Sequence, residues 1–176
     1  MNKNLKVVLV GLPGSGKSTF GRQLAQELGF PFLDLDQQIE EKYLKKIPEI
    51  FSIYGEGNFR EWETETLSGL LDRDSSFILA SGGGAPCFND NMELINSKSI
   101  SVYLDVPLES ISQRLQASKV QNRPMFLGLD QGEIILKLKS LLVSREYFYN
   151  QAKIKLSGED FSAELLMHEL INLLKS

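Results

Sequence analysis

The 176-residue sequence has one cysteine and one histidine, and these shortages exclude whole classes of site. Cys87 alone cannot form an internal disulfide, and His168 alone cannot supply a histidine-rich metal site. Such cysteine usage fits a reducing compartment. No apolar run approaches the ~20 residues of a membrane-spanning helix, and no signal-peptide core precedes the first apolar segment. We therefore expect a cytoplasmic protein that has no membrane partner.

The sequence also lacks an excess of basic charge. It has 19 Lys and Arg residues against 23 Asp and Glu, which gives a formal net charge of −4, and the basic residues are scattered. This balance disfavours nucleic acid as the main partner, although it leaves room for a local basic pocket that binds an anion. The hydrophobic fraction of 42% is ordinary for a globular protein of this length. We expect a single domain over residues 1–176, with no internal repeat.

A phosphate-binding loop stands near the start of the chain. Residues 11–18 read G-x-x-x-x-G-K-S, between an apparent strand and an apparent helix, as the motif requires. The backbone N–H groups of such a loop point at nucleotide phosphates. Lys17 is placed to reach the β- and γ-phosphates, and the Ser18 hydroxyl to ligate Mg²⁺. The loop, residues 11–19, therefore supplies the predicted ATP contacts Gly14, Ser15, Gly16, Lys17, Ser18 and Thr19.

Short apolar runs alternate with longer amphipathic stretches, a pattern typical of a parallel sheet with helices on both faces. The pattern predicts five strands, at residues 5–10, 31–34, 77–80, 100–104 and 152–156. It predicts helices at residues 17–28, 37–46, 49–54, 57–71, 90–95, 107–116, 132–150 and 161–174. Gly29 is expected to cap the end of the first helix.

Two carboxylates follow the second predicted strand. In open parallel sheets the ligand site lies beyond the carboxyl ends of the strands. The sequence "FLDLD" puts Asp34 and Asp36 on the same side of an extended segment at such an end. Asp34 is suited to hold Mg²⁺ through its water shell, and Asp36 to accept a proton or hydrogen bonds from substrate hydroxyls. The plain alternative for Asp36 is a helix N-cap.

Three consecutive glycines follow the third predicted strand, in "SGGGAP". Glycine there costs conformational entropy and adds no packing, so the bare backbone is expected to lie close to another group. We interpret Gly82, Gly83 and Gly84 as a surface for a small second substrate; a structural turn is the alternative. This strand carries no aspartate at its end, so the predicted metal site relies on Ser18 and Asp34.

Two arginines and one loop complete the set of candidates. Arg60 and Glu63 are three residues apart on one helix face, so the carboxylate can orient the guanidinium, unless they form only a surface ion pair. Arg145 lies near the end of a long helix, where a cation is also favourable for the helix dipole alone. The stretch "KVQNRPMFLGLDQG", residues 119–132, has no clear period and is interpreted as a closing lid. His168 is expected on a solvated helix face.

In this order, "GLPGSGKST", "FLDLD", "FR" with an acid three residues on, "GGGA", "RP" and R-x-x-x-Y resemble the shikimate kinases over nearly the whole chain. The resemblance implies a P-loop NTPase-type α/β fold, similar to the nucleoside monophosphate kinases. Its five-stranded parallel sheet has the order 2-3-1-4-5, with helices on both faces and a lid. It also implies a cytoplasmic, usually monomeric enzyme of aromatic amino acid biosynthesis. Such an enzyme transfers the γ-phosphate of ATP, with Mg²⁺, to the 3-hydroxyl of shikimate.

The resemblance carries over to individual residues. It makes Asp36 a shikimate ligand, Arg60 and Arg145 the carboxylate-binding pair, and Arg123 the lid arginine. A small carboxylate with three hydroxyls needs guanidinium contacts at one end and a carboxylate acceptor at the other. The predicted catalytic residues are Lys17, Asp36 and Arg123. The predicted substrate residues are Asp36, Arg60, Gly82, Gly83, Gly84 and Arg145, with a substrate-binding segment at about 34–63 and a lid at about 117–131.

Some positions depart from the family pattern, and two other functions stay open. Arg114 is the only arginine shortly before "RP", whereas the family often has a second one that stacks on adenine. Arg114 and Arg123 are therefore predicted to bind ATP, but the adenine contact is open, and Pro86 and Cys87 have no predicted role. Another small-molecule kinase, similar to gluconate kinase, is the alternative enzyme. A nucleotide-dependent switch is the alternative outside enzymes, although it needs no second-substrate residues.

Overall fold

The computed structural model describes residues 4–117 and 124–175, and its centre is a parallel sheet. Strand β1, Lys6–Val10, is almost entirely β-branched or apolar and is buried on both faces, as the middle strand of a covered parallel sheet must be. It pairs in parallel with β3, Phe77–Ala80, and with β4, Ile100–Asp105. The edge strands are β2, Phe32–Asp34, and β5, Ile154–Ser157. The observed order, β2-β3-β1-β4-β5, confirms the predicted topology.

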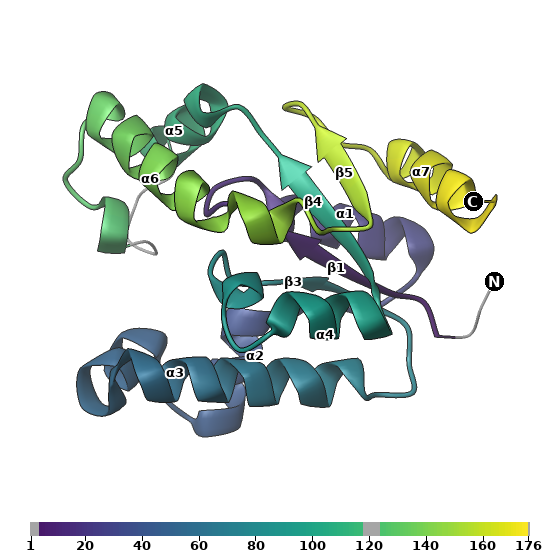
Figure 1. Cartoon of the computed structure of the whole chain (residues 1–176), viewed down its shortest axis with the longest axis horizontal. Helices are drawn as coiled ribbons and strands as arrows, with labels where there is room; N and C mark the ends of the chain where they lie inside the picture. The colour runs from purple at the N-terminus through teal and green to yellow at the C-terminus, as the bar shows by residue number, and fades with distance from the viewer. Residues whose placement is uncertain (1–3, 118–123, 176) are drawn as a thin grey trace.

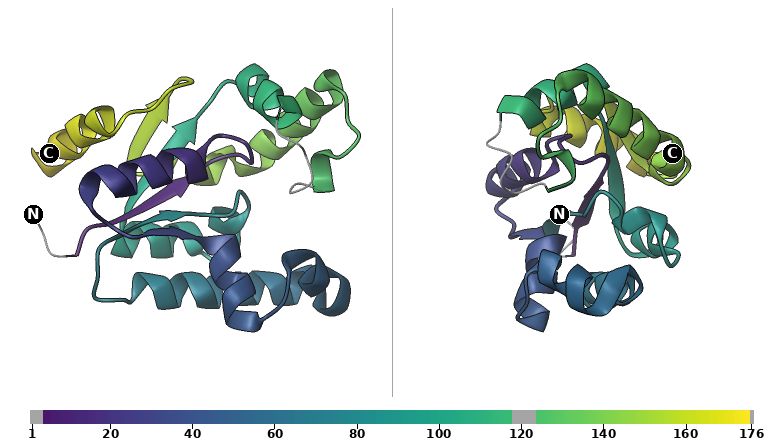
Figure 2. Two further views of the ribbon diagram at one scale, coloured as in Figure 1. Left: turned by 180° about the vertical axis from the view of Figure 1, so that it is seen from behind. Right: turned by 90° about the vertical axis from the view of Figure 1, so that its left-hand side faces the viewer.

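Helices cover both faces of this sheet (Figure 1 and Figure 2). They are α1 Lys17–Leu28, α2 Leu35–Tyr43, α3 Ile47–Leu71, α4 Asn91–Lys98, α5 Leu108–Ala117, α6 Gln131–Tyr149 and α7 Ala163–Lys175. Short 3₁₀ helices lie at Ala85–Cys87 (η1) and Pro124–Phe126 (η3). None of the described helices is long and apolar enough to cross a membrane.

Alternate residues of β1 belong to two different cores, because successive strand side chains point to opposite faces. Val8 and Val10 pack in the larger core with α2, α3, α4 and α6. Val7 and Leu9 pack in the smaller core with α1 and α7. Figure 1 shows α3 beside α4, and α7 at the C-terminal end of the chain. The two cores fix the loops at the carboxyl edge of the sheet, where the predicted site residues lie.

One local prediction is confirmed and another needs correction. The sequence pattern predicts separate helices at residues 49–54 and 57–71, and α3 indeed consists of two helices that meet at a kink at Gly55, whose φ of 79° and ψ of 172° suit glycine alone. Asp36 was expected on an extended segment beside Asp34. Instead β2 ends at Asp34, and Asp36 lies in the first turn of α2. The physical reason is that the Asp34 carboxylate accepts a hydrogen bond from the Asp36 backbone N–H and so begins the helix early. The predicted Gly29 cap is confirmed, with φ 68°.

Candidate active site

The phosphate loop leaves the first turn of α1 open to a ligand. Gly16 precedes the helix in the left-handed region, with φ 94°, and no side chain caps the helix start. The first N–H groups of a helix have no partner within the helix, and they favour an anion. The Ser15 hydroxyl is also buried, and among the described residues it has no hydrogen-bond partner. The geometry therefore fits phosphate binding by the predicted residues of this loop.

Lys17 is buried within the loop that it is predicted to serve. Its Nζ donates hydrogen bonds to the carbonyl oxygens of Gly11 and Leu12, at 2.8 and 2.9 Å. These contacts hold the ammonium group beside the same backbone that a nucleotide phosphate would contact. A lysine at this position can turn from the carbonyls to phosphate oxygens with a small change of side-chain conformation.

The two predicted metal ligands lie side by side. The Ser18 hydroxyl donates to Asp34 Oδ2 at 3.0 Å, which brings the end of β2 against the start of α1. Mg²⁺ prefers oxygen ligands and keeps several waters, so it needs one or two protein groups besides nucleotide phosphates. Within residues 4–117 and 124–175, no cluster of three acidic, cysteine or histidine side chains could hold a metal. The pair fits a magnesium ion that is held mainly by phosphate and water.

The carboxyl group of Asp36, next to the glycine triplet, has a raised pKa. Burial of its carboxyl group and the nearby charge of Asp34 raise the pKa of Asp36 to about 6, and Lys17 opposes both effects. A carboxylate with this pKa is a better proton acceptor than an ordinary aspartate. The helix position of Asp36 corrects its predicted backbone, but its side chain still points at the predicted site, as its contact with the glycine triplet indicates.

The glycine triplet is the surface on which the predicted substrate residues meet. A Cβ atom on Gly82 would lie 3.0 Å from Asp36 Oδ1 and 3.3 Å from Glu63 Oε1. On Gly83 it would lie 2.9 Å from Pro13 Cδ and 3.2 Å from Arg145 Nη1, and on Gly84 it would lie 3.0 to 3.3 Å from the guanidinium of Arg60. These separations are below ordinary contact distance. Side chains from α2, α3 and α6 therefore approach the bare backbone of residues 82–84.

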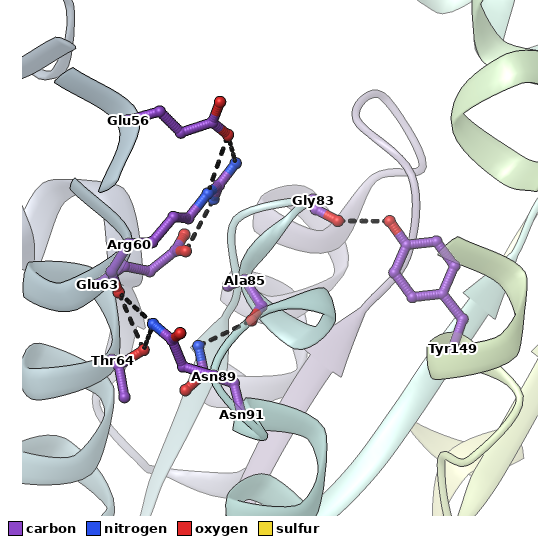
Figure 3. A network of polar contacts seen from close by, with 9 residues as sticks. All are labelled: Glu56, Arg60, Glu63, Thr64, Gly83, Ala85, Asn89, Asn91 and Tyr149. Atoms are coloured by element: carbon purple, nitrogen blue, oxygen red, sulfur yellow. Dashed lines mark hydrogen bonds and ion pairs between the residues drawn. The ribbon is translucent and has the colours of Figure 1, made fainter. Parts of the chain in front are cut away.

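Arg60 is held between several groups (Figure 3). Its Nη1 donates to Glu63 Oε2 at 2.8 Å, and its Nε and Nη2 donate to Glu56 Oε1 at 3.3 and 3.1 Å. Its guanidinium also lies 4.0 Å from the centre of the Phe88 ring. The Glu63 side chain is only 1% exposed, and burial raises its pKa although Arg60 lowers it. The alternative of a simple surface pair is therefore wrong, and Glu63 orients the guanidinium as predicted.

Arg145 reaches the triplet from the last turns of α6, and Tyr149 fixes the end of that helix. The Tyr149 hydroxyl donates to the Gly83 carbonyl oxygen, across 66 residues of sequence. Its ring is fully buried against Tyr103, and burial raises the pKa of its hydroxyl far above the ordinary value. This buried hydrogen bond therefore joins the last turn of α6 to the glycine triplet. Arg145 thus lies one helical turn before Tyr149, the residue that is hydrogen-bonded to the triplet.

Arg114 lies on the other side of the phosphate loop. Its Nη1 donates to the Ser15 carbonyl oxygen at 3.4 Å, and its Nη2 donates to the Glu159 carbonyl oxygen at 2.5 Å. This position beside the loop is compatible with the predicted ATP contact. Arg123, the predicted lid and catalytic arginine, lies outside the described residues, as does most of residues 117–123 of the predicted lid. The remainder of the lid contains η3 and ends where α6 begins, at Gln131.

Sequence reasoning missed the loop that follows the triplet. Asn89 and Asp90 both adopt left-handed backbone conformations, with φ 49° and 57°, which are uncommon outside glycine. This geometry lets Asn89 Nδ2 donate to the Arg60 carbonyl oxygen and the Thr64 hydroxyl, at 3.2 and 3.1 Å. It also brings Phe88 onto the guanidinium. The sequence "FND" after a short apolar turn was the available signal, because Asn and Asp tolerate the left-handed region best.

Comparison with known proteins points in one direction. A family model described as shikimate kinase matches residues 13–175. A shikimate kinase of Parabacteroides distasonis is 38% identical over 169 residues, which cover 96% of this chain and 96% of that protein. The crystal structure of a shikimate kinase from Bacteroides thetaiotaomicron has a TM-score of 0.86 and 34% identity, and covers 98% of this chain and 99% of its own. The structure of a shikimate kinase from Acinetobacter baumannii in complex with shikimate has a TM-score of 0.81 and 37% identity, and the match covers 97% of this chain and 93% of that one.

The alternative small-molecule kinase is a more distant match. A gluconokinase from Sinorhizobium meliloti covers 99% of this chain and 94% of its own, but with a TM-score of 0.57 and 16% identity. A likeness at that identity reflects the shared fold alone. The switch alternative also has no explanation for the side chains that converge on residues 82–84.

Proposed function

The chain belongs to the shikimate kinase family, and we propose that its glycine triplet is the floor of the shikimate site, with Arg60 and Arg145 at the substrate carboxylate and Asp36 at the reacting hydroxyl. As a member of that family it is an ATP-dependent enzyme that phosphorylates a hydroxyl of shikimate. The observation that carries the residue assignment is the convergence of these three side chains on residues 82–84. Two cations and one carboxylate there match an acid with several hydroxyls.

In this proposal the oxygen of the 3-hydroxyl of shikimate attacks the γ-phosphorus of ATP, and the bond from that phosphorus to the bridging oxygen of ADP breaks. Asp36 accepts the proton of the attacking hydroxyl, which its raised pKa favours. Lys17 and the N–H groups of the phosphate loop stabilise the charge on the transferred group. Little covalent chemistry is asked of the protein, so position and charge supply the rate. Arg123 is proposed to add a further positive charge at the same group.

Mg²⁺ is the proposed cofactor, with Ser18 and Asp34 as its protein contacts. When bound, the ion would neutralise charge on the β- and γ-phosphates. The 3.0 Å contact between the two side chains supports this assignment, since it brings together a hydroxyl oxygen and a carboxylate oxygen, which are ligand types that Mg²⁺ prefers. We further propose that residues 1–176 act as one kinase domain, with the phosphate loop at 11–19, the substrate segment at about 34–63 and the lid at about 117–131. The enzyme is proposed to be cytoplasmic and monomeric.

A coupled assay of ADP release tests the activity directly. With ATP and Mg²⁺ present, ADP release should depend on shikimate, and should stay near background with gluconate or with a nucleoside monophosphate as acceptor. Nuclear magnetic resonance of the product should locate the phosphate on the 3-hydroxyl. ATP turnover that is indifferent to shikimate would refute the activity, and phosphate on another hydroxyl would refute the proposed orientation in the site.

A further inference from the structure

The guanidinium of Arg60 contacts other groups of the protein on most of its sides. Its own side chain is 14% exposed. Phe88 covers one face, Gly84 approaches it through the bare backbone, and buried Glu63 holds Nη1. The edge formed by Nε and Nη2 is different, because its partner is Glu56, whose side chain is 60% exposed. Figure 3 shows the two glutamates on opposite sides of the guanidinium.

Glu56 uses this edge incompletely. Both Nε and Nη2 donate to the same oxygen, Oε1, at 3.3 and 3.1 Å. A carboxylate that is free to align would place one oxygen on each nitrogen, which is the stronger, two-bond geometry. An exposed ion pair of the kind that Glu56 makes is also among the weakest in proteins. The edge is therefore occupied by a carboxylate that a better-aligned carboxylate can replace.

The backbone beside Glu56 supports this exchange. Gly55, the residue before it, breaks α3 with a conformation that other residues avoid, and a Cβ there would meet no atom within 4 Å. Glu56 thus stands in the first turn after the break, where a carboxylate is favourable even without an arginine partner. Loss of the Arg60 contact therefore leaves Glu56 in an acceptable, solvated position. Glu63 has no such alternative, since it is buried.

We propose that Glu56 is an internal competitor for the substrate carboxylate at Arg60: it occupies the Nε and Nη2 edge in the free enzyme and leaves when shikimate binds. This inference rests on the proposed function, in which Arg60 binds that carboxylate. Glu56 keeps the arginine neutralised and oriented while the site is empty, and it lowers the affinity for the acid by the strength of the contact that must break. It therefore sets substrate affinity without touching the substrate.

The test is the dissociation constant of shikimate, measured by equilibrium titration of Glu56→Gln and of the unaltered protein. Trp62, the single tryptophan, lies two residues from Arg60 and stacks on Tyr43 at 4.0 Å, so its fluorescence offers a signal. We expect Glu56→Gln to bind shikimate about two- to five-fold more tightly, the range of an exposed ion pair. The methyl ester of shikimate should bind equally to both proteins, because it cannot use the vacated edge as a charged partner.

Two further variants separate competition from other effects. Glu61→Gln removes the same charge from the same helix, and Glu61 is exposed with no ion pair in the described structure, so its shikimate affinity should stay unchanged. In an Arg60→Ala background, Glu56→Gln should have no effect, since the contested group is gone. If Glu61→Gln strengthened shikimate binding as much as Glu56→Gln does, the effect would come from the net charge of the helix, and the competition proposal would be wrong.

The outcomes distinguish this inference from the function on which it rests. Weaker or unchanged shikimate binding in Glu56→Gln, while Arg60→Ala still loses its preference for the acid over the ester, would overturn the competitor and leave the proposed function intact. Weaker binding would mean that Glu56 positions Arg60 in the bound state as well. An Arg60→Ala protein that keeps the wild-type preference for the acid would overturn both.

Discussion

A single methyl group added to the glycine triplet should lower activity with shikimate and leave the stability of the fold nearly unchanged. In Gly84→Ala the new Cβ would lie 3.0 Å from Nη2, 3.1 Å from Nη1 and 3.3 Å from Cζ of Arg60. An ordinary contact is about 3.5 Å or longer, so the guanidinium must move by about half an ångström. It would do so against Phe88 and Glu63, which hold it on two sides.

The magnitude follows from the proposed role of that guanidinium at the substrate carboxylate. Misplacement of a binding group by about 1 Å costs on the order of 10²-fold in rate, so a shift of half that size should cost about 10-fold or more in kcat/KM for shikimate. The KM for ATP should change little, because the phosphate loop is not touched. The free energy of unfolding should not fall together with the activity, because Gly84 has φ −91°, which alanine adopts freely. Replacing glycine also lowers the conformational entropy of the unfolded chain, which stabilises the fold by about 0.4–1 kcal/mol. We expect Tm within about 4 °C of the original.

Steady-state kinetics with each substrate varied in turn, together with thermal unfolding, gives the required readouts. Gly69→Ala is the matched control, because Gly69 lies in α3 and a Cβ there would meet nothing within 4 Å. It should raise stability by up to about 1 kcal/mol and leave both KM values unchanged. A Gly84→Ala enzyme with the original kcat/KM for shikimate would refute the claim that this backbone and Arg60 form one substrate surface.

Three further changes test the other parts of the site. Lys17→Ala should lower kcat by ~10²-fold or more in a protein with an unchanged circular dichroism spectrum, and near-normal turnover would exclude its charge from catalysis. The kcat/KM profile should fall as pH decreases through about 6, because protonated Asp36 cannot accept the hydroxyl proton; a profile without that limb, or one that Asp36→Asn retains, would contradict this role. Tyr149→Phe should destabilise the fold by about 1–3 kcal/mol in denaturant unfolding, since the Gly83 carbonyl oxygen loses its donor. The same change should raise the KM for shikimate more than the KM for ATP. An equal rise in both KM values would contradict a link between Tyr149 and the substrate site.

The topology, and the candidate residues that follow the strands, could be predicted from patterns that are local in the sequence. The spacing of the phosphate loop fixes a strand, a loop and a helix together, and glycines at the end of a buried strand have few explanations other than close approach. Gly82, Gly83 and Gly84 were therefore predictable as a contact surface. Which side chain meets which glycine was not, since that depends on how α2, α3 and α6 pack around the sheet.

The errors and omissions have physical causes of the same kind. Asp36 is helical and not extended as expected, because the Asp34 side chain caps the start of α2. Tyr149 has no local signal, because its partner is 66 residues away. Phe88 and Asn89 act through a left-handed turn that their sequence permits but does not require. Propensity is a weak guide wherever a tertiary contact decides the conformation.

The claim at the centre of this account is that Arg60 and Arg145 converge on one substrate carboxylate, and an acid–ester comparison tests it most directly. The measurement is kcat/KM for shikimate and for its methyl ester with the unaltered enzyme, Arg60→Ala and Arg145→Ala. Truncation of one partner of a buried charge pair costs ~2–5 kcal/mol, so each variant should lose roughly 30-fold to several thousand-fold with the acid. Lysine at either position should restore only part of the loss. The ester should impose a similar penalty on the unaltered enzyme but add little in either variant, because both changes remove the same contact. Equal ester penalties in all three proteins would contradict the account and leave Arg60 and Arg145 without the carboxylate that their geometry implies.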